Sequence, residues 1–151
     1  VYAWINGSSF AQVPGQPVRR DEEGRVAMVL PEGSREDATA KIHPFKLHRG
    51  VLPVLTEQQW IAPITTEELY HHGDPDKAVR DGVKNLYGLD DAAFTWEKTI
   101  RYMGIYHAVP PAEDALACGD CHSPGGRMNW QALGYEADPY PLPAVAGGKQ
   151  Q

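Results

Sequence analysis

The clearest pattern of apolar positions lies in the middle of the chain. Val79, Val83 and Leu86 are spaced so that they share one face of a helix, and mostly polar residues lie between them. Pro75, preceded by an aspartate that suits the N-cap, fits the first helical position, and Gly88 fits the C-terminal stop. The sequence therefore predicts an amphipathic helix between these two residues.

A second stripe of apolar positions predicts a longer helix over about residues 91–106. Trp96, Ile100 and Met103 fall at i, i+4 and i+7, and His107 follows at i+11. On a helix that continues to that point, all four side chains share one stripe. We therefore expect His107 to be directed along an apolar wall.

The other predicted elements are short. Residues 1–38 favour strands and turns, with a strand over 25–30 and a short N-terminal β hairpin. Acidic residues in a first turn after two prolines lead into a third helix that carries Cys118, and a fourth helix is expected over 129–133. The predicted fold class is mainly α, with extensive irregular loops.

One short run carries far more specific chemistry than the rest of the chain. Cys118-Gly-Asp-Cys121-His122 is a C-x-x-C-H motif, the attachment pattern of covalent haem c. Each thiol can form a thioether with a haem vinyl group, while His122 reaches the iron from the same side. A redox C-x-x-C or half of a zinc site is the alternative. The chain has 2 cysteines, which excludes a four-cysteine zinc site within it, and a redox motif does not require the histidine. We therefore expect one haem c per chain.

The other axial position of the iron has more candidates than one haem needs. A thioether ligand raises the reduction potential, a second imidazole lowers it, and an empty position admits small molecules. His107 is favoured because it lies between the apolar stripe and the motif, His48 follows, and His43 is a weaker candidate. The alternative for each is an ordinary hydrogen-bonded core or surface imidazole. The remaining candidates are His71, His72, Met28, Met103 and Met128.

The residues around the motif resemble a known family. The segments that carry the resemblance are residues 40–50, 107–122, 126–135 and 138–139. They are similar to the C-terminal portion of multihaem c-type cytochromes of the octahaem tetrathionate reductase type. With the intervening helix, the resemblance covers roughly residues 38–139, and its spacing makes it more specific than a bare haem motif.

The resemblance implies closely stacked, low-potential haems with two histidine ligands each. His48 and His107 stand at positions where family members place distal ligands, often for a haem attached elsewhere in the chain. This sequence departs from the family pattern because it has one haem motif where the relatives have several. Either it is a piece whose spare histidines ligate haems of a partner, or it is a reduced, single-haem relative. The first alternative makes better use of the surplus histidines.

Composition limits the organisation and the partners. The length of 151 residues suits one domain, and 13 prolines with 15 glycines favour irregular backbone. We expect a single haem-binding domain over 1–139, made of a strand and turn region (1–38) and a haem-associated region (39–139), with an extended tail over 140–151. The net charge of -6 argues against nucleic acid as a partner, and no apolar stretch approaches the ~18 residues that cross a bilayer.

Two classes of function remain open. The first is an electron-transfer module of the multihaem type, working with other cytochrome subunits or redox proteins in the periplasm or outside the cell, because haem is attached covalently outside the cytoplasmic membrane. The second is a fragment or subunit of a multihaem reductase acting on sulfur or nitrogen oxyanions. That chemistry needs an open iron position and cationic groups such as Lys46, Arg49 or His43. The sequence offers no dedicated cluster for it, which favours an electron carrier over a catalyst acting on its own.

Overall fold

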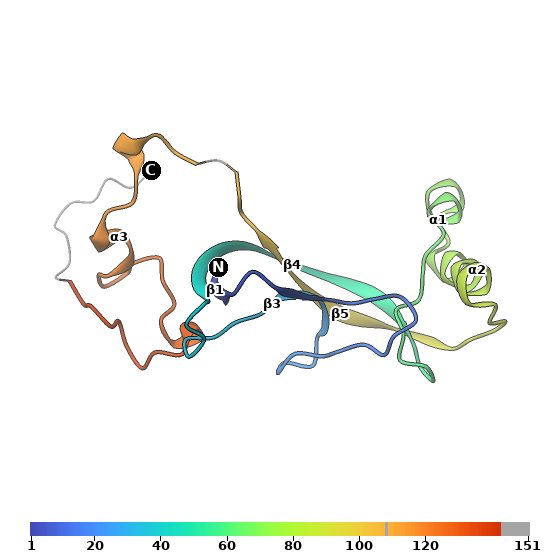
Figure 1. The fold of residues 1–151 in the computed structure, drawn as a ribbon. Coiled ribbons are helices and arrows are strands. Elements are labelled where there is room, and N and C mark those ends of the chain that lie inside the picture. The colour runs from blue at the N-terminus through green and yellow to red at the C-terminus, as the bar shows by residue number, and fades with distance from the viewer. Residues whose placement is uncertain (108, 143–151) are drawn as a thin grey trace. The chain divides into compact units, whose positions relative to one another are not determined.

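The fold is mixed α and β rather than mainly α, so the predicted fold class is wrong. The computed structural model describes residues 1–107 and 109–142, and these contain a five-stranded sheet in the order β1-β4-β5-β3-β2. Figure 1 shows β4 and β5 as long neighbouring strands. The strands are β1 (Tyr2–Ile5), β2 (Ser9–Ala11), β3 (Val26–Pro31), β4 (Lys41–Leu55) and β5 (Phe94–Gly104). The helical elements are α1 (Thr66–His72), α2 (Pro75–Tyr87), α3 (Cys118–Cys121) and the 3-10 turns η1 (Ala112–Asp114) and η2 (Gln131–Leu133).

The helix predicted over about residues 91–106 is wrong, because most of this segment forms strand β5. The strand pairs in parallel with β3 and has β4 on its other side. Ile100 is buried, but Trp96 and Met103 are 43% and 40% exposed, so the predicted stripe is not a buried face. The segment is rich in aromatic and β-branched residues, which suit a strand. Pairing with strands far away in the sequence therefore decided between two conformations that the local pattern allowed.

Strand β4 is not among the elements predicted from the sequence. It runs for 15 residues and pairs antiparallel with β1, from Ile5 opposite Lys41 to Tyr2 opposite Pro44. Pro44 has no N–H to donate, but its carbonyl accepts a hydrogen bond of 3.0 Å from the Ile105 amide. One proline is therefore accommodated within a paired strand.

Two compact units make up the chain. The first comprises residues 1–9, 31–47 and the segment from Met103 onward, and the second comprises 10–30 and 48–102. Each unit thus combines part of the predicted strand and turn region with later residues. No helix of the described residues has the length and apolar character that crossing a bilayer requires.

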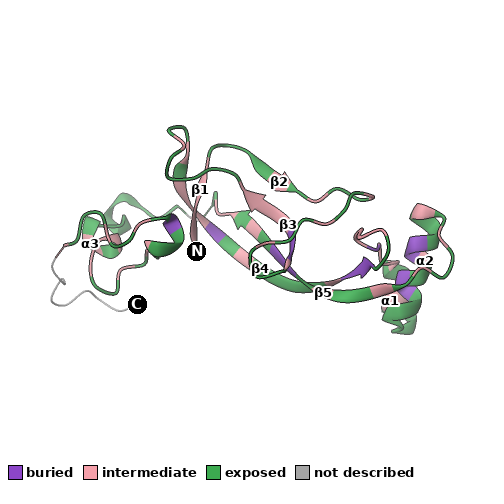
Figure 2. Ribbon diagram, turned by 90° about the horizontal axis from the view of Figure 1, so that it is seen from below, coloured by how far each residue is buried: buried purple, intermediate pink, exposed green. Residues whose placement is uncertain are grey.

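Helix α2 confirms the strongest local prediction and builds the core of the second unit. The Asp74 carboxylate accepts a hydrogen bond of 2.9 Å from the Lys77 amide at the N-cap, and Gly88 ends the helix in the left-handed conformation. Val79 and Val83 are buried, whereas the third residue of the predicted stripe, Leu86, is 58% exposed. Figure 2 shows buried positions on α2 and along β4. Together with Leu55 and Ala62, these two valines form a buried hydrophobic cluster. The partly buried residues packed against this cluster are Trp60, Ile64, Tyr87, Leu89, Ala92 and Phe94.

Gly82 is the position at which α2 comes closest to the preceding loop. A Cβ atom at this glycine would overlap the backbone carbonyl of Pro63. Replacing Gly82 with alanine should raise helix propensity by about 1 kcal/mol but force the helix away from the loop, at an overpacking cost of about 1–3 kcal/mol. We therefore expect Gly82→Ala to lower the free energy of unfolding measured in denaturant. Asn85→Ala, at an exposed position of the same helix, is the control and should not destabilise. Equal stability of the two variants would contradict this packing.

Candidate haem-binding site

The C-x-x-C-H motif lies on one helical turn, as the sequence predicts. In α3 the His122 amide donates to the Cys118 carbonyl at 2.9 Å, and the Asp120 carboxylate accepts from the Ala117 amide at 2.8 Å, which holds the start of the turn. Both cysteines are free, Cys118 exposed and Cys121 half-buried. Residues three apart on a helical turn are neighbours on its surface. Both thiols can therefore react with the same molecule.

The imidazole of His122 is held by a carboxylate 16 residues further along the chain. Its Nδ1 lies 2.7 Å from Oδ1 of Asp138, and the same oxygen accepts a hydrogen bond of 2.9 Å from the Tyr140 amide. The two side chains are 26% and 16% exposed. The His122 carbonyl also accepts from the Leu142 amide at 2.7 Å, so both ends of the residue are attached to the 138–142 segment.

Two aromatic rings complete the surroundings of this imidazole. Trp130 stacks on it with ring centroids 4.8 Å apart and an interplanar angle of 23°, and Tyr140 meets it edge-on at 6.1 Å and 85°. Hydrogen bond and stacking together fix both the direction and the rotation of the ring. His122 is therefore oriented by its neighbours within the first unit.

The charge of Asp138 decides which nitrogen of His122 carries the proton. Partial burial acts to raise the pKa of Asp138, but the hydrogen bonds from His122 and the Tyr140 amide outweigh it and lower that pKa below its ordinary value. An ionised carboxylate only accepts hydrogen bonds, so Nδ1 donates. None of the described residues forms a hydrogen bond with Nε2. The lone pair of Nε2 is thereby left for a ligand.

These groups fit covalent haem c. Haem c needs two thiols on one turn and an imidazole with a free lone pair next to them, and Cys118, Cys121 and His122 provide them. A second-shell carboxylate on the other ring nitrogen is the usual arrangement of a metal-binding histidine. The chemistry of these three donors thus suits a covalently bound haem c.

The predicted distal ligands are distributed over both units. Among the described residues, no three His, Cys, Asp or Glu side chains lie close enough to hold a metal ion. His107 is exposed just beyond β5, in the same unit as the motif, and His48 is exposed on β4, in the second unit. His71 and His72 are exposed in the last turn of α1.

His43, the weaker candidate, is enclosed by aromatic rings. It stacks on Tyr106 with ring centroids 4.6 Å apart and meets Phe45 edge-on at 5.3 Å. Its Nε2 is buried and forms no hydrogen bond with any of the described residues. A buried polar atom without a partner costs folding free energy. A variant that removes this nitrogen can therefore show whether His43 is an iron ligand or an ordinary core residue.

Sequence reasoning missed the three residues that surround His122. Asp138, Trp130 and Tyr140 follow the motif by 8 to 18 residues, and loops bring them back to it. The available signal was the polar and aromatic character of residues 129–140, which carries no periodicity. A carboxylate placed by a loop cannot be assigned to a partner from spacing alone.

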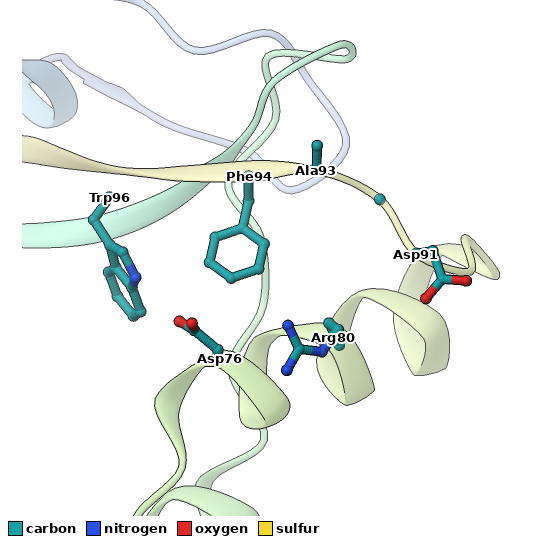
Figure 3. Close-up of a pocket in the computed structure, with 7 residues that line it drawn as sticks. Asp76, Arg80, Asp91, Ala93, Phe94 and Trp96 are labelled. Carbon is teal, nitrogen blue, oxygen red and sulfur yellow. The ribbon is translucent and has the colours of Figure 1, made fainter.

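A surface cavity of about 480 Å³ is lined by residues of the second unit alone. Figure 3 shows Phe94 and Trp96 of β5 extending toward Asp76 and Arg80 of α2, with Asp91 at the far end. The two rings meet edge-on at 6.2 Å. The lining contains no residue of the C-x-x-C-H turn, so this cavity does not belong to the candidate haem site.

Comparisons with known proteins agree with the motif. The family model described as bacterial cytochrome c matches residues 1–125. The chain is also similar to the crystal structure of an octahaem cytochrome c from Shewanella oneidensis, with 32% identity and a TM-score of 0.78. That match covers 91% of this chain and 33% of the octahaem chain, so this chain spans about a third of its length. No curated protein sequence matches.

The environment of His43 predicts the effect of removing its buried nitrogen. Phenylalanine keeps a ring for Tyr106 to stack on and removes a polar atom whose unpaired burial costs about 1–3 kcal/mol. We expect His43→Phe to leave the free energy of unfolding equal or higher and the iron spin state unchanged. His72→Phe, at an exposed position, is the control for adding a phenyl ring. A destabilised variant with new high-spin iron would show instead that Nε2 binds the iron.

Proposed function

Since this chain belongs to the bacterial cytochrome c family, we propose that it is an electron-transfer module with one covalently bound haem. The observation that carries the proposal is the arrangement of Cys118, Cys121 and His122 on one turn, with Nε2 of the histidine left free by the Asp138 hydrogen bond. When bound, haem supplies an iron that changes between ferric and ferrous states. Cys118 and Cys121 would hold the group through thioethers, and His122 would be its proximal ligand.

The remaining residues of the site serve this role by keeping His122 rigid. Asp138 fixes the tautomer, and Trp130 and Tyr140 limit the rotation of the ring. A ligand that does not reorient when the iron changes charge keeps the reorganisation energy of electron transfer small. The protein part of the mechanism is thus the positioning of His122, with the electron supplied and removed by redox partners.

We further propose that the chain works inside a multihaem assembly of the octahaem tetrathionate reductase type. Its similarity to about a third of an octahaem cytochrome c supports this placement. His48 and His107 are exposed imidazoles on or beside long strands, which suits them as distal ligands of this haem or of a neighbouring one. The partners are then other multihaem subunits or redox proteins.

The proposed location follows from the cofactor. Thioether attachment takes place outside the cytoplasmic membrane, so the module would work in the periplasm or at the cell exterior. The 2 cysteines are both used by haem in this proposal, so neither is available for a disulfide.

Removing the two thiols tests the attachment site. The Cys118→Ser, Cys121→Ser double variant should show no covalent haem after denaturing electrophoresis, because no thioether can form. His107→Ala is the control, since the proposed attachment does not involve this residue, and it should keep the stain. Haem that stays covalently bound to the double variant would contradict the site.

Removing the exposed imidazoles tests their roles as distal ligands. We expect His107→Ala, and to a smaller extent His48→Ala, to convert low-spin iron to high-spin iron in this chain or in its complex with a multihaem partner, because an axial nitrogen is lost. Optical and electron paramagnetic resonance spectra measure the change. His71→Ala removes an exposed histidine of α1 and should have no effect. An unchanged spin state in the His107 variant would remove this residue from the ligand set.

A further inference from the structure

The carboxylate of Asp138 is placed for a role beyond holding a ring. Its Oδ1 lies 2.7 Å from Nδ1 of His122 and 2.9 Å from the Tyr140 amide, so one oxygen is fixed by backbone and directed at the histidine. A backbone amide two residues away limits the freedom of the side chain to turn toward solvent. The carboxylate is thus held in position to accept a hydrogen bond from Nδ1.

Within the described part of the chain, the charge of Asp138 is not shared with a lysine or an arginine. Among the described residues, His122 is the one ion-pair partner found for this carboxylate, and no lysine or arginine pairs with it. Its side chain is 16% exposed, so water competes weakly for its oxygens. Hydrogen bonds to a charged acceptor in such surroundings are about twice as strong as those between neutral groups. The effect of the charge therefore falls mainly on the imidazole.

The loop that carries Asp138 is itself anchored. The Arg127 amide donates to the Asp120 carbonyl at 2.9 Å, and the Tyr135 amide donates to the Trp130 carbonyl at 3.0 Å. The Trp4 indole N–H donates to the Leu133 carbonyl at 2.9 Å, which attaches the loop to strand β1. The distance between carboxylate and imidazole is thus set by the fold of the first unit.

We propose that Asp138 is a positioning residue that gives His122 partial imidazolate character and so lowers the reduction potential of the haem iron. A carboxylate that accepts a hydrogen bond from Nδ1 raises the electron density at Nε2. A more basic ligand favours ferric over ferrous iron. The inference rests on the proposed function, because it requires His122 as the proximal ligand. The inference adds that Asp138 sets how strongly His122 donates electron density to the iron.

The test compares three variants of the full chain, matured with haem, at one fixed pH. Asp138→Asn keeps an acceptor of the same shape and removes the charge. Asp138→Glu keeps the charge. Glu136→Gln removes an equal charge from an exposed position of the same loop, where no side-chain contact to His122 is found. Spectroelectrochemistry gives the reduction potential, and electron paramagnetic resonance of the ferric state reports the ligand field.

We expect Asp138→Asn to shift the equilibrium toward ferrous iron about tenfold, which corresponds to ~59 mV for a one-electron couple. Its ferric g values should change as well. Asp138→Glu should recover most of the shift, and Glu136→Gln should cause little. A potential of Asp138→Asn equal to that of the wild type, or an equal shift in Glu136→Gln, would overturn the inference.

The wild type provides a second test if the Asn variant does not accumulate as a folded holoprotein. The proton on Nδ1 of an axial histidine gives a hyperfine-shifted resonance in paramagnetic proton spectra. We expect that proton to exchange slowly in D₂O, because Asp138 holds it, and immediate exchange would overturn the inference. The proposed function fails separately, through a wild type without covalent haem, so the two failures are distinguishable.

Discussion

The candidate site depends on the hydrogen bond of 2.7 Å between His122 and Asp138. It joins a single helical turn to a loop 16 residues away, and it leaves Nε2 as the nitrogen with a free lone pair. Without it, a C-x-x-C-H run would still offer two thiols and a histidine, but the imidazole would be free to change tautomer. The hydrogen bond to Asp138 thus orients His122 next to the two thiols of the motif.

The first unit supports that contact through its short strand β1. Trp4 attaches β1 to η2 by its indole N–H, and the Arg35 guanidinium donates to the Gly134 carbonyl at 2.8 Å while lying over the Tyr135 ring. Residues near the start of the chain therefore hold the loop that returns to His122. The sheet contributes to the site because its strand β1 anchors this loop.

Local signals determined which parts could be predicted from the sequence. Helix α2 has its cap, its first-turn proline and its terminal glycine within 15 residues, and the haem motif is contiguous, so both were recognised. Strand β5 was predicted as a helix because its apolar residues at i, i+4 and i+7 fit a helical stripe. The strand β3 that pairs with it lies about 70 residues earlier in the sequence. Asp138 was missed for the same reason, since loop closure and not spacing brings it to His122.

The most direct test of the account is the optical spectrum of the purified full chain, oxidised and reduced with dithionite, together with haem quantitation and intact mass. The account predicts one covalent haem per chain and a reduced spectrum typical of a c-type cytochrome, with low-spin iron once the distal ligand is in place, alone or with a multihaem partner. A chain of unmodified mass without covalent haem after maturation would contradict the central claim.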